Sequence, residues 1–218
     1  MNAVIIGANG GIGKALADAL VEEDASVHRL ARPECDILDE ASLAVAAAGA
    51  GTPDLVVVAT GLLHEGEHGP EKAIRDLDPD WLARQYAVNA IGPALVAKHF
   101  LPIMPRAGRS VFAVLSARVG SISDNRLGGW YGYRASKAAL NQLVRTLSIE
   151  DKRRNDRSIV VALHPGTVDT KLSRPFQQSG RDIFRPDRAA VQLLDVLDGL
   201  KPQDSGKIIA WDGTEIAP

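Results

Sequence analysis

Gly7-Ala8-Asn9-Gly10-Gly11-Ile12-Gly13 is the stretch of sequence that decides the fold. It follows the apolar run at residues 3–6 and precedes residues 14–20, whose apolar side chains recur with helical spacing. Glycine lets backbone N–H groups approach a phosphate closely, and a helix N-terminus adds partial positive charge there. A strand, a glycine-rich turn and a helix start, in this order, therefore predict a cradle for a pyrophosphate.

The alternation of strand and helix continues along the chain. Short runs rich in β-branched residues predict strands at 3–6, 26–30, 55–59, 110–115, 159–163 and 208–210. Helical spacing predicts helices at about 11–23, 40–48, 79–104, 133–152 and 187–197. Most of the strand runs are apolar throughout, which is typical of strands buried on both faces of a parallel sheet. The sequence predicts an α/β fold, a Rossmann-type doubly wound parallel sheet flanked by helices, with long loops at 61–78 and 171–185.

The composition indicates one globular domain and disfavours several other classes. The 218 residues, of which 45% are hydrophobic and 24% charged, suggest a single domain over 1–218. A formal charge of −2 gives no basic field for nucleic acid, so we expect no nucleic-acid partner. The lone cysteine, Cys35, and the lack of a leader or a long apolar run predict a cytoplasmic protein that does not bind membranes.

Two competing motifs fail in their context. Gly13-Lys14 resembles the end of an NTPase P-loop, but Ala8 and Ala15 stand where that loop needs a glycine and a Mg²⁺-binding hydroxyl. Residues 64–68 spell the zinc-protease pattern His-Glu-x-x-His, yet Gly66 disfavours the helix that would bring both imidazoles to one face. We therefore expect no NTPase chemistry and no metal site.

Two further features indicate which cofactor the glycine-rich turn would bind and which residue would act as an acid or base. Arg32 follows the second strand, where a dinucleotide fold often has a carboxylate for the ribose 2′-hydroxyl; a guanidinium there favours NADP(H), while NAD(H) remains an alternative. Tyr133 and Lys137 are four residues apart, so on a helix they share a face. An ammonium group beside a phenol is expected to lower its pKa, which makes Tyr133 a candidate general acid/base.

Together these motifs resemble the short-chain dehydrogenase/reductase family, and most closely its small carbonyl reductases of the C-factor and sniffer type. The ordered matches are Gly7-x-x-x-Gly11-x-Gly13, Asp36-Ile37 after a third strand, Ala59-Thr60-Gly61, Asn89 within Val88 to Gly92, Tyr133-x-x-x-Lys137 and Pro165-Gly166-Thr167-Val168-Asp169-Thr170. They extend over nearly the whole chain.

The resemblance implies a hydride-transfer site. In such a site Tyr133 protonates the substrate oxygen, Lys137 lowers the pKa of Tyr133 and binds the nicotinamide ribose, and Asn89 holds a water. The remaining residues implied to bind the cofactor are Gly7, Asn9, Gly11, Ile12, Gly13, Arg32, Asp36, Ile37, Ala59, Thr60, Gly61, Pro165, Gly166, Val168 and Thr170. The loop 171–185, with Phe176 and Phe184, and residues 128–131 are expected to form the walls of a moderately apolar pocket. The family also implies a homodimer or homotetramer.

The sequence departs from the family at three places. The family has two serines at the end of the strand 110–115, and Ala117 stands at the second, so Ser116 is our candidate for that role, Ser121 the alternative, and neither a third possibility. Residues 58–61 replace the family's Asn-Asn-Ala-Gly. Position 10 is Gly rather than basic, which leaves Arg32 alone to favour NADP(H).

The leading hypothesis is therefore an NADP(H)-dependent oxidoreductase that reduces a carbonyl or oxidises an alcohol. Because Ala117 stands where the family has its second serine, an alternative is a dinucleotide-binding regulatory or signalling protein with weak catalysis. An isomerase, epimerase or dehydratase on the same fold is a third alternative that no residue selects.

Overall fold

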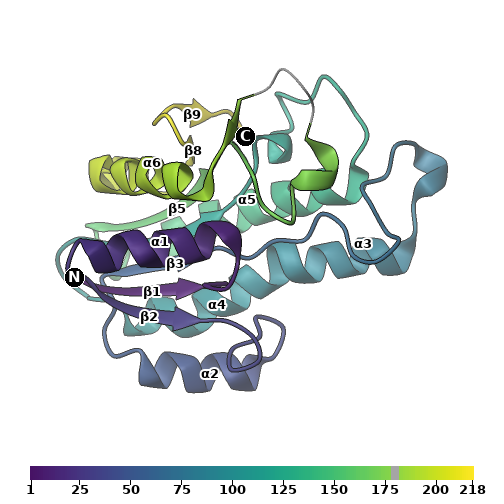
Figure 1. The fold of residues 1–218 in the computed structure, drawn as a ribbon. Coiled ribbons are helices and arrows are strands. Elements are labelled where there is room, and N and C mark those ends of the chain that lie inside the picture. The colour runs from purple at the N-terminus through teal and green to yellow at the C-terminus, as the bar shows by residue number, and fades with distance from the viewer. Residues whose placement is uncertain (178–181) are drawn as a thin grey trace.

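The computed structural model describes residues 1–177 and 182–218 and is built on one seven-stranded sheet (Figure 1). The strand order is β2 (Ser26–Leu30), β1 (Asn2–Ile6), β3 (Leu55–Val58), β4 (Ser110–Leu115), β5 (Ser158–His164), β8 (Ile208–Ala210) and β9 (Glu215–Ile216). Neighbouring strands run parallel except β8 and β9. The short strands β6 (Thr167–Val168) and β7 (Ile183–Phe184) pair separately. All six predicted strands and the doubly wound parallel sheet are confirmed.

Helices cover both faces of the sheet (Figure 1). One layer contains α1 (Gly11–Glu22) and α6 (Pro186–Gly199), and the other contains α2 (Glu40–Gly49), α4 (Gly92–Phe100) and α5 (Tyr131–Asp151). Successive strand residues point to opposite faces, so Val4 packs in one hydrophobic cluster and Ile5 in the other. This burial on both faces explains why the strand runs are apolar throughout.

The prediction of one uninterrupted helix over 79–104 is wrong. The segment divides into α3 (Pro79–Tyr86), a π-helical turn at Ala87–Ile91, α4 and a 3₁₀ turn at Leu101–Ile103. Pro93 has no N–H to donate within the helix, so the regular hydrogen-bond pattern cannot continue through it. The π-helical turn places Asn89 on its buried side, a position where such turns often serve a site.

The third strand implied before Asp36 is also absent. Residues 31–39, between β2 and α2, contain no strand, and β2 is the edge of the sheet. The loop instead turns back on itself, with the Cys35 N–H donating to the Ala31 carbonyl over 3.0 Å. Arg32 and Asp36 consequently lie on one short loop at the carboxyl end of the edge strand.

The two long loops predicted near the ligand are present where the structure describes them. Residues 61–78 contain a bridge between Glu65 and His68 and a 3₁₀ turn at Ile74–Asp76, and residues 171–177 contain another at Arg174–Phe176. Residues 178–181 of the predicted loop 171–185 lie outside the described residues. Within 1–177 and 182–218, no helix combines the length and apolar character required to cross a membrane.

Candidate active site

Two cavities lie beyond the carboxyl ends of the parallel strands, where ligands of such sheets bind. The first, which we call the glycine-turn cavity, has a volume of about 430 Å³ and is lined by Gly7, Gly10 and the loop that follows β2. The second, the tyrosine cavity, measures about 460 Å³ and is lined by Tyr133 and by residues that follow β4 and β5. The glycine-rich turn contributes to both cavities, with Gly7, Asn9 and Gly10 lining the first and Ile12 the second.

The glycine-rich turn itself fits a bound dinucleotide. Gly7 has φ +85°, a conformation that favours glycine, and a Cβ on Gly13 would lie 2.3 Å from the Gly7 carbonyl oxygen. A Cβ on Gly11 would lie 2.8 Å from Cγ2 of Thr170. Thr60 Oγ1, beside this turn, is buried and has no hydrogen-bond partner among the described residues. The close packing of this turn therefore requires glycine at these positions, and Thr60, whose hydroxyl is unpaired, is a lining residue of the glycine-turn cavity.

The predicted cofactor residues divide between the two cavities. Those that line the glycine-turn cavity are Gly7, Asn9, Arg32, Asp36, Ile37, Ala59, Thr60 and Gly61. Those that line the tyrosine cavity are Ile12, Tyr133, Pro165, Gly166, Val168 and Thr170. Gly11, Gly13, Asn89 and Lys137 are not lining residues of either cavity.

Tyr133 and Lys137 project from the first turns of α5, and both are buried, with 8% and 3% of their surfaces exposed. Lys137 Nζ donates to the Leu115 carbonyl over 2.8 Å and lies 5.9 Å from the centre of the Tyr133 ring. Burial raises the pKa of Tyr133 to about 12 and lowers the pKa of Lys137 to about 8. Desolvation disfavours the charged form of each group, and it is the effect that sets the direction of both shifts in this structure.

A buried carboxylate holds the start of α5. Glu71, with 3% exposed, accepts the Gly132 N–H over 3.1 Å through Oε2 and the Gln85 Nε2–H over 2.8 Å through Oε1. Its backbone carbonyl accepts the Trp130 N–H, and Trp130 takes a left-handed conformation with φ +52°. A carboxylate at a helix N-terminus is favoured by the helix dipole. These contacts fix the turn immediately before Tyr133.

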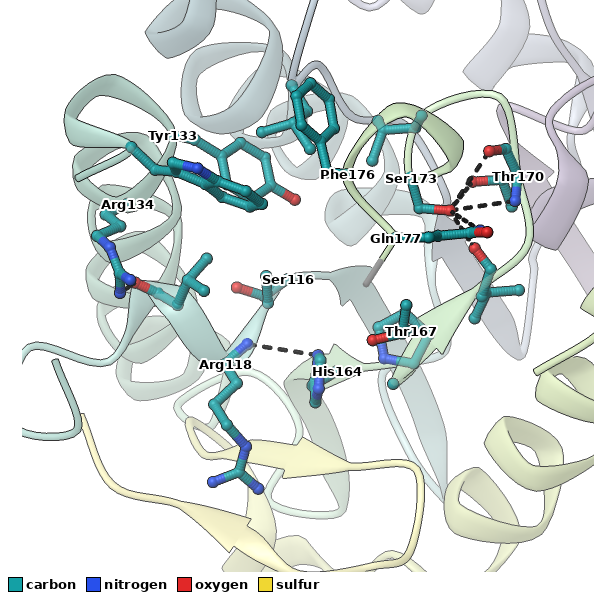
Figure 2. A pocket seen from close by; sticks show the side chains of 18 of the residues that line it. Ser116, Arg118, Tyr133, Arg134, His164, Thr167, Thr170, Ser173, Phe176 and Gln177 are labelled. Atoms are coloured by element: carbon teal, nitrogen blue, oxygen red, sulfur yellow. Dashed lines mark hydrogen bonds between the residues drawn. The ribbon is translucent and has the colours of Figure 1, made fainter. Parts of the chain in front are cut away.

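Ser116 and Ser121, the two candidate serines, occupy different surroundings. Ser116 lines the tyrosine cavity beside Ala117, and its hydroxyl donates to Asn141 Oδ1 over 2.7 Å. Figure 2 shows Ser116 and the Tyr133 hydroxyl facing the same cavity. Ser121 is not a lining residue there, and its hydroxyl accepts the Asp124 N–H over 3.1 Å. The geometry favours Ser116 over Ser121 as a group that could reach a ligand.

Asn89 is fully buried and binds protein groups on both sides of its amide. Its Nδ2 donates to the Leu62 carbonyl over 2.8 Å and to Ser136 Oγ over 3.1 Å, and its Oδ1 accepts the Leu62 N–H over 2.8 Å. Both Nδ2 donors are used, and Oδ1 retains one lone pair that could accept from a water. Asn89 thus fastens the loop 61–78 to the π-helical turn and to α5.

Aromatic side chains form one wall of the tyrosine cavity. Trp130 packs edge-on against both Tyr133 and Phe176, with ring centres 6.2 and 5.6 Å apart. The prediction for Phe184 is wrong, because this residue is buried against Trp211, 4.7 Å away, and does not line the cavity. Of residues 128–131, only Trp130 lines it, since the others turn toward a neighbouring hollow or solvent.

Sequence reasoning missed several lining residues, four of which carry ionisable side chains and contact one another in pairs. His164 and Arg118 line the tyrosine cavity, where the His164 Nδ1 accepts the Arg118 N–H over 3.3 Å (Figure 2). Burial, aided by the Arg118 charge, lowers the pKa of His164 to about 4. The position of His164 at the end of β5, directly before Pro165, was the signal available. Glu65 and Arg84 line the glycine-turn cavity; Glu65 belongs to the His-Glu-x-x-His segment, which indicates a different chemistry, and no local pattern marks Arg84.

The His-Glu-x-x-His segment forms a turn with the Glu65 to His68 bridge instead of a helix. His64 Nε2 lies 3.1 Å from the Lys171 carbonyl oxygen, whereas His68 stacks on Trp81 with ring centres 5.2 Å apart. The two imidazoles thus contact different parts of the chain, an arrangement that does not suit a shared metal ion.

Comparisons with known proteins add to this geometry. The profile of a family described as enoyl-(acyl carrier protein) reductase matches residues 28–210. The C-signal protein of Myxococcus xanthus is 37% identical over 145 residues, which cover 66% of this chain and 82% of that protein. The 1-hydroxy-2-glutathionyl-2-methyl-3-butene dehydrogenase of Rhodococcus sp. (strain AD45) is 34% identical over 141 residues, 65% of this chain and 60% of that one.

Solved structures share the fold over almost the full chain. An NADPH-bound carbonyl reductase from chicken fatty liver superposes with a TM-score of 0.84 at 23% identity, covering 99% of this chain and 93% of that one. The carbonyl reductase Sniffer of D. melanogaster superposes with a TM-score of 0.83 at 22% identity, covering 100% of both chains. At these identities the similarity establishes the architecture.

Proposed function

Since the chain belongs to the short-chain dehydrogenase/reductase family of oxidoreductases, we propose that it transfers a hydride between NADP(H) and a carbonyl or alcohol substrate, with Tyr133 as general acid/base. A single observation carries the proposal. Tyr133 faces a cavity of about 460 Å³ whose lining includes Pro165 to Val168, while Lys137 lies 5.9 Å from its ring. A bound nicotinamide would supply the hydride, and the protein would supply orientation and a proton.

In the proposed reaction, the protonated Tyr133 hydroxyl donates its proton to the substrate oxygen as the carbonyl carbon is reduced. A pKa raised to about 12 keeps this phenol protonated at neutral pH, which suits the reductive direction. The Lys137 ammonium, near the ring, would stabilise the phenolate left after proton transfer. Ser116 would donate a hydrogen bond to the same oxygen, in exchange for its bond to Asn141. Asn89 would use the free lone pair of Oδ1 to hold a water that returns the proton.

Several observations support NADP(H) as the cofactor. Arg32 lines the glycine-turn cavity and makes no ion pair within the described part of the chain. A guanidinium at this place would bind a 2′-phosphate. NADPH is bound in the carbonyl reductase from chicken fatty liver, which has the same fold. The remaining residues proposed to bind the cofactor are the lining residues of the two cavities given above, with Gly11 and Gly13 shaping the turn.

The wall formed by Trp130 and Phe176 favours a substrate with an apolar or aromatic group beside its carbonyl. By resemblance to the family, we also propose a single NAD(P)-binding domain over 1–218 that assembles as a homodimer or homotetramer in the cytoplasm. Size-exclusion chromatography with light scattering would test the assembly.

The deciding experiment compares wild-type protein with Tyr133→Phe. Binding of NADPH and NADH is measured first by calorimetry, and NADPH oxidation is then followed with aldehydes, ketones and quinones. We expect wild-type turnover with at least one substrate, and a loss of about 1,000-fold in Tyr133→Phe with unchanged NADPH affinity. Full turnover in Tyr133→Phe would overturn the proposed mechanism.

A second candidate is a dinucleotide-binding regulatory protein with weak catalysis. Ala117, which lacks a hydroxyl beside the Tyr133 cavity, and the similarity to the C-signal protein favour it. This candidate predicts tight NADPH binding without turnover on the same panel of substrates. The experiment above therefore distinguishes the oxidoreductase, which turns over at least one substrate, from the regulatory protein, which binds NADPH without turnover.

A further inference from the structure

Four charged side chains line the glycine-turn cavity. Arg32 and Asp36 lie on the loop after β2, Glu65 lies on the loop 61–78, and Arg84 lies on α3. Of these four, only Arg32 and Asp36 were predicted from the sequence to bind the cofactor. Because the four residues come from three segments of the chain, their meeting is a product of the tertiary structure.

Arg84 and Glu65 form a two-pronged ion pair. Arg84 Nε and Nη2 each donate to one oxygen of Glu65, and both distances are 3.0 Å. The Arg84 guanidinium is the main reason why the pKa of Glu65 is lowered. The side chains are nonetheless 36% and 52% exposed, so water screens the pair and limits its contribution to stability. The pair can therefore open at small cost.

The other two charges act on this pair. The positive charge of Arg32 also lowers the pKa of Glu65, and the negative charge of Asp36 helps to raise the pKa of Arg84. Arg32 itself makes no ion pair and no side-chain hydrogen bond with residues that the structure describes. The opening of the cavity thus holds two guanidinium groups and only one of them is engaged by a carboxylate.

We propose that Arg84 is a specificity-determining residue for the 2′-phosphate of NADP(H), and that Glu65 is the ligand this phosphate displaces. The inference rests on the proposed function, which assigns the adenosine end of the cofactor to this cavity. A phosphate monoester carries about −1.5 to −2 charge and accepts from guanidinium groups in the same two-pronged way as a carboxylate. It would bind between Arg32 and Arg84 and leave Glu65 to water.

Because only NADP(H) has a 2′-phosphate that can displace Glu65, only NADP(H) would bind Arg84. The neutral 2′-hydroxyl of NAD(H) cannot compete with the Glu65 carboxylate for a guanidinium, because a charged acceptor binds it more strongly. NAD(H) would therefore leave the Arg84–Glu65 pair intact. Glu65 would weaken NADP(H) binding by competition, and Arg84 would strengthen it.

The proposal is tested by replacing Arg84 and Glu65 separately, because the two replacements should change NADPH affinity in opposite directions. Arg84→Gln and Glu65→Gln are compared with wild type for calorimetric binding of NADPH, NADH, adenosine 2′,5′-bisphosphate and 5′-AMP, which needs no turnover. We expect Arg84→Gln to weaken the two ligands with a 2′-phosphate about 10-fold, and Glu65→Gln to tighten them about 3-fold. NADH and 5′-AMP should change less than about 2-fold in both variants.

Arg29→Gln is the matched control, because Arg29 pairs with Asp18 over 2.7 Å at the surface and is not a lining residue of the cavity. It should leave all four affinities unchanged. If the Arg84–Glu65 pair only anchors the loop 61–78, both variants would shift NADPH and NADH alike and in the same direction, which overturns the inference. Wild-type protein that binds neither cofactor would instead overturn the proposed function, and this inference with it.

Discussion

The two cavities next to the glycine-rich turn differ in the surroundings of their ionisable side chains. At the tyrosine cavity, Tyr133 and the neighbouring Lys137 are buried and His164 is partly buried, and desolvation shifts each pKa so that the neutral form is favoured. In the glycine-turn cavity, Arg84 and Glu65 are half-exposed and stay charged because they pair with each other. Burial suits groups that must hold or transfer a proton, whereas exposed ions suit exchange of one charged partner for another. We expect the first cavity to respond to pH and the second to salt.

The largest effect that would sharpen this comparison is expected for Lys137→Met. The variant removes the ammonium nearest the Tyr133 ring, so the phenolate loses its stabilising charge, and turnover at pH 7 should fall about 100-fold. Steady-state kinetics at saturating NADPH would measure it. Lys98→Met, which removes an exposed partner of Glu40, should retain full turnover. A Lys137→Met variant within about 3-fold of wild type would remove Lys137 from the proposed mechanism.

The next effect concerns His164 and the acid stability of the tyrosine cavity. The pKa of His164 in the folded protein is about 4, below the ordinary value near 6.5. Between these two pH values the imidazole is protonated in the unfolded chain and neutral in the folded chain. The contribution of His164 to the free energy of unfolding is therefore full above pH 6.5 and falls by about 3 kcal/mol as the pH drops to 4. The charges that face the ring are Arg118 and Asp212.

His164→Asn should remove this loss, because its side-chain oxygen can accept the Arg118 N–H without titrating. Urea unfolding of both proteins between pH 4 and 7 would show the difference. Parallel pH profiles for wild type and His164→Asn would mean that the imidazole is not shielded from solvent.

A smaller effect is expected from the two residues at the end of β4. Ser116→Ala should lower kcat about 10-fold if its hydroxyl leaves Asn141 to bind the substrate oxygen. Adding Ala117→Ser to that variant should restore activity, because a hydroxyl would again line the cavity. Ser121→Ala is the control and should not change kcat, since Ser121 lies outside the lining. Unchanged kcat in Ser116→Ala would leave Tyr133 as the sole donor to the oxygen.

The smallest expected effect is a difference in salt dependence between cofactor binding at the glycine-turn cavity and turnover at the tyrosine cavity. Raising NaCl from 50 to 500 mM should weaken NADPH binding about 5-fold, because ions screen the exposed Arg32 and Arg84 charges. The rate constant for turnover at saturating NADPH should change less, since Tyr133 and Lys137 are buried and poorly screened. Equal salt dependence of NADPH and NADH affinity would contradict an exposed site for the 2′-phosphate.

Sequence patterns predicted much of the fold and part of the site. The apolar runs and helical spacings predicted the six parallel strands of the main sheet and most helices, because strand and helix periods are local properties of the chain, but they missed the two-residue strands β6, β7 and β9. The spacing of Tyr133 and Lys137 placed both on α5. The helix over 79–104 was predicted without its π-helical turn, since the effect of Pro93 on hydrogen bonding depends on how the neighbouring turns pack.

The amino-acid sequence by itself thus determined the sheet, the glycine-rich turn and the Tyr133–Lys137 pair, because each depends on residues close together in the chain. Only the tertiary structure decided that Arg84 and Glu65 join Arg32 at one opening, and that Glu71 holds the start of α5. It also decided the direction of the Tyr133 pKa shift. Such features arise from segments far apart in sequence and from the loss of water on burial, neither of which a local pattern records.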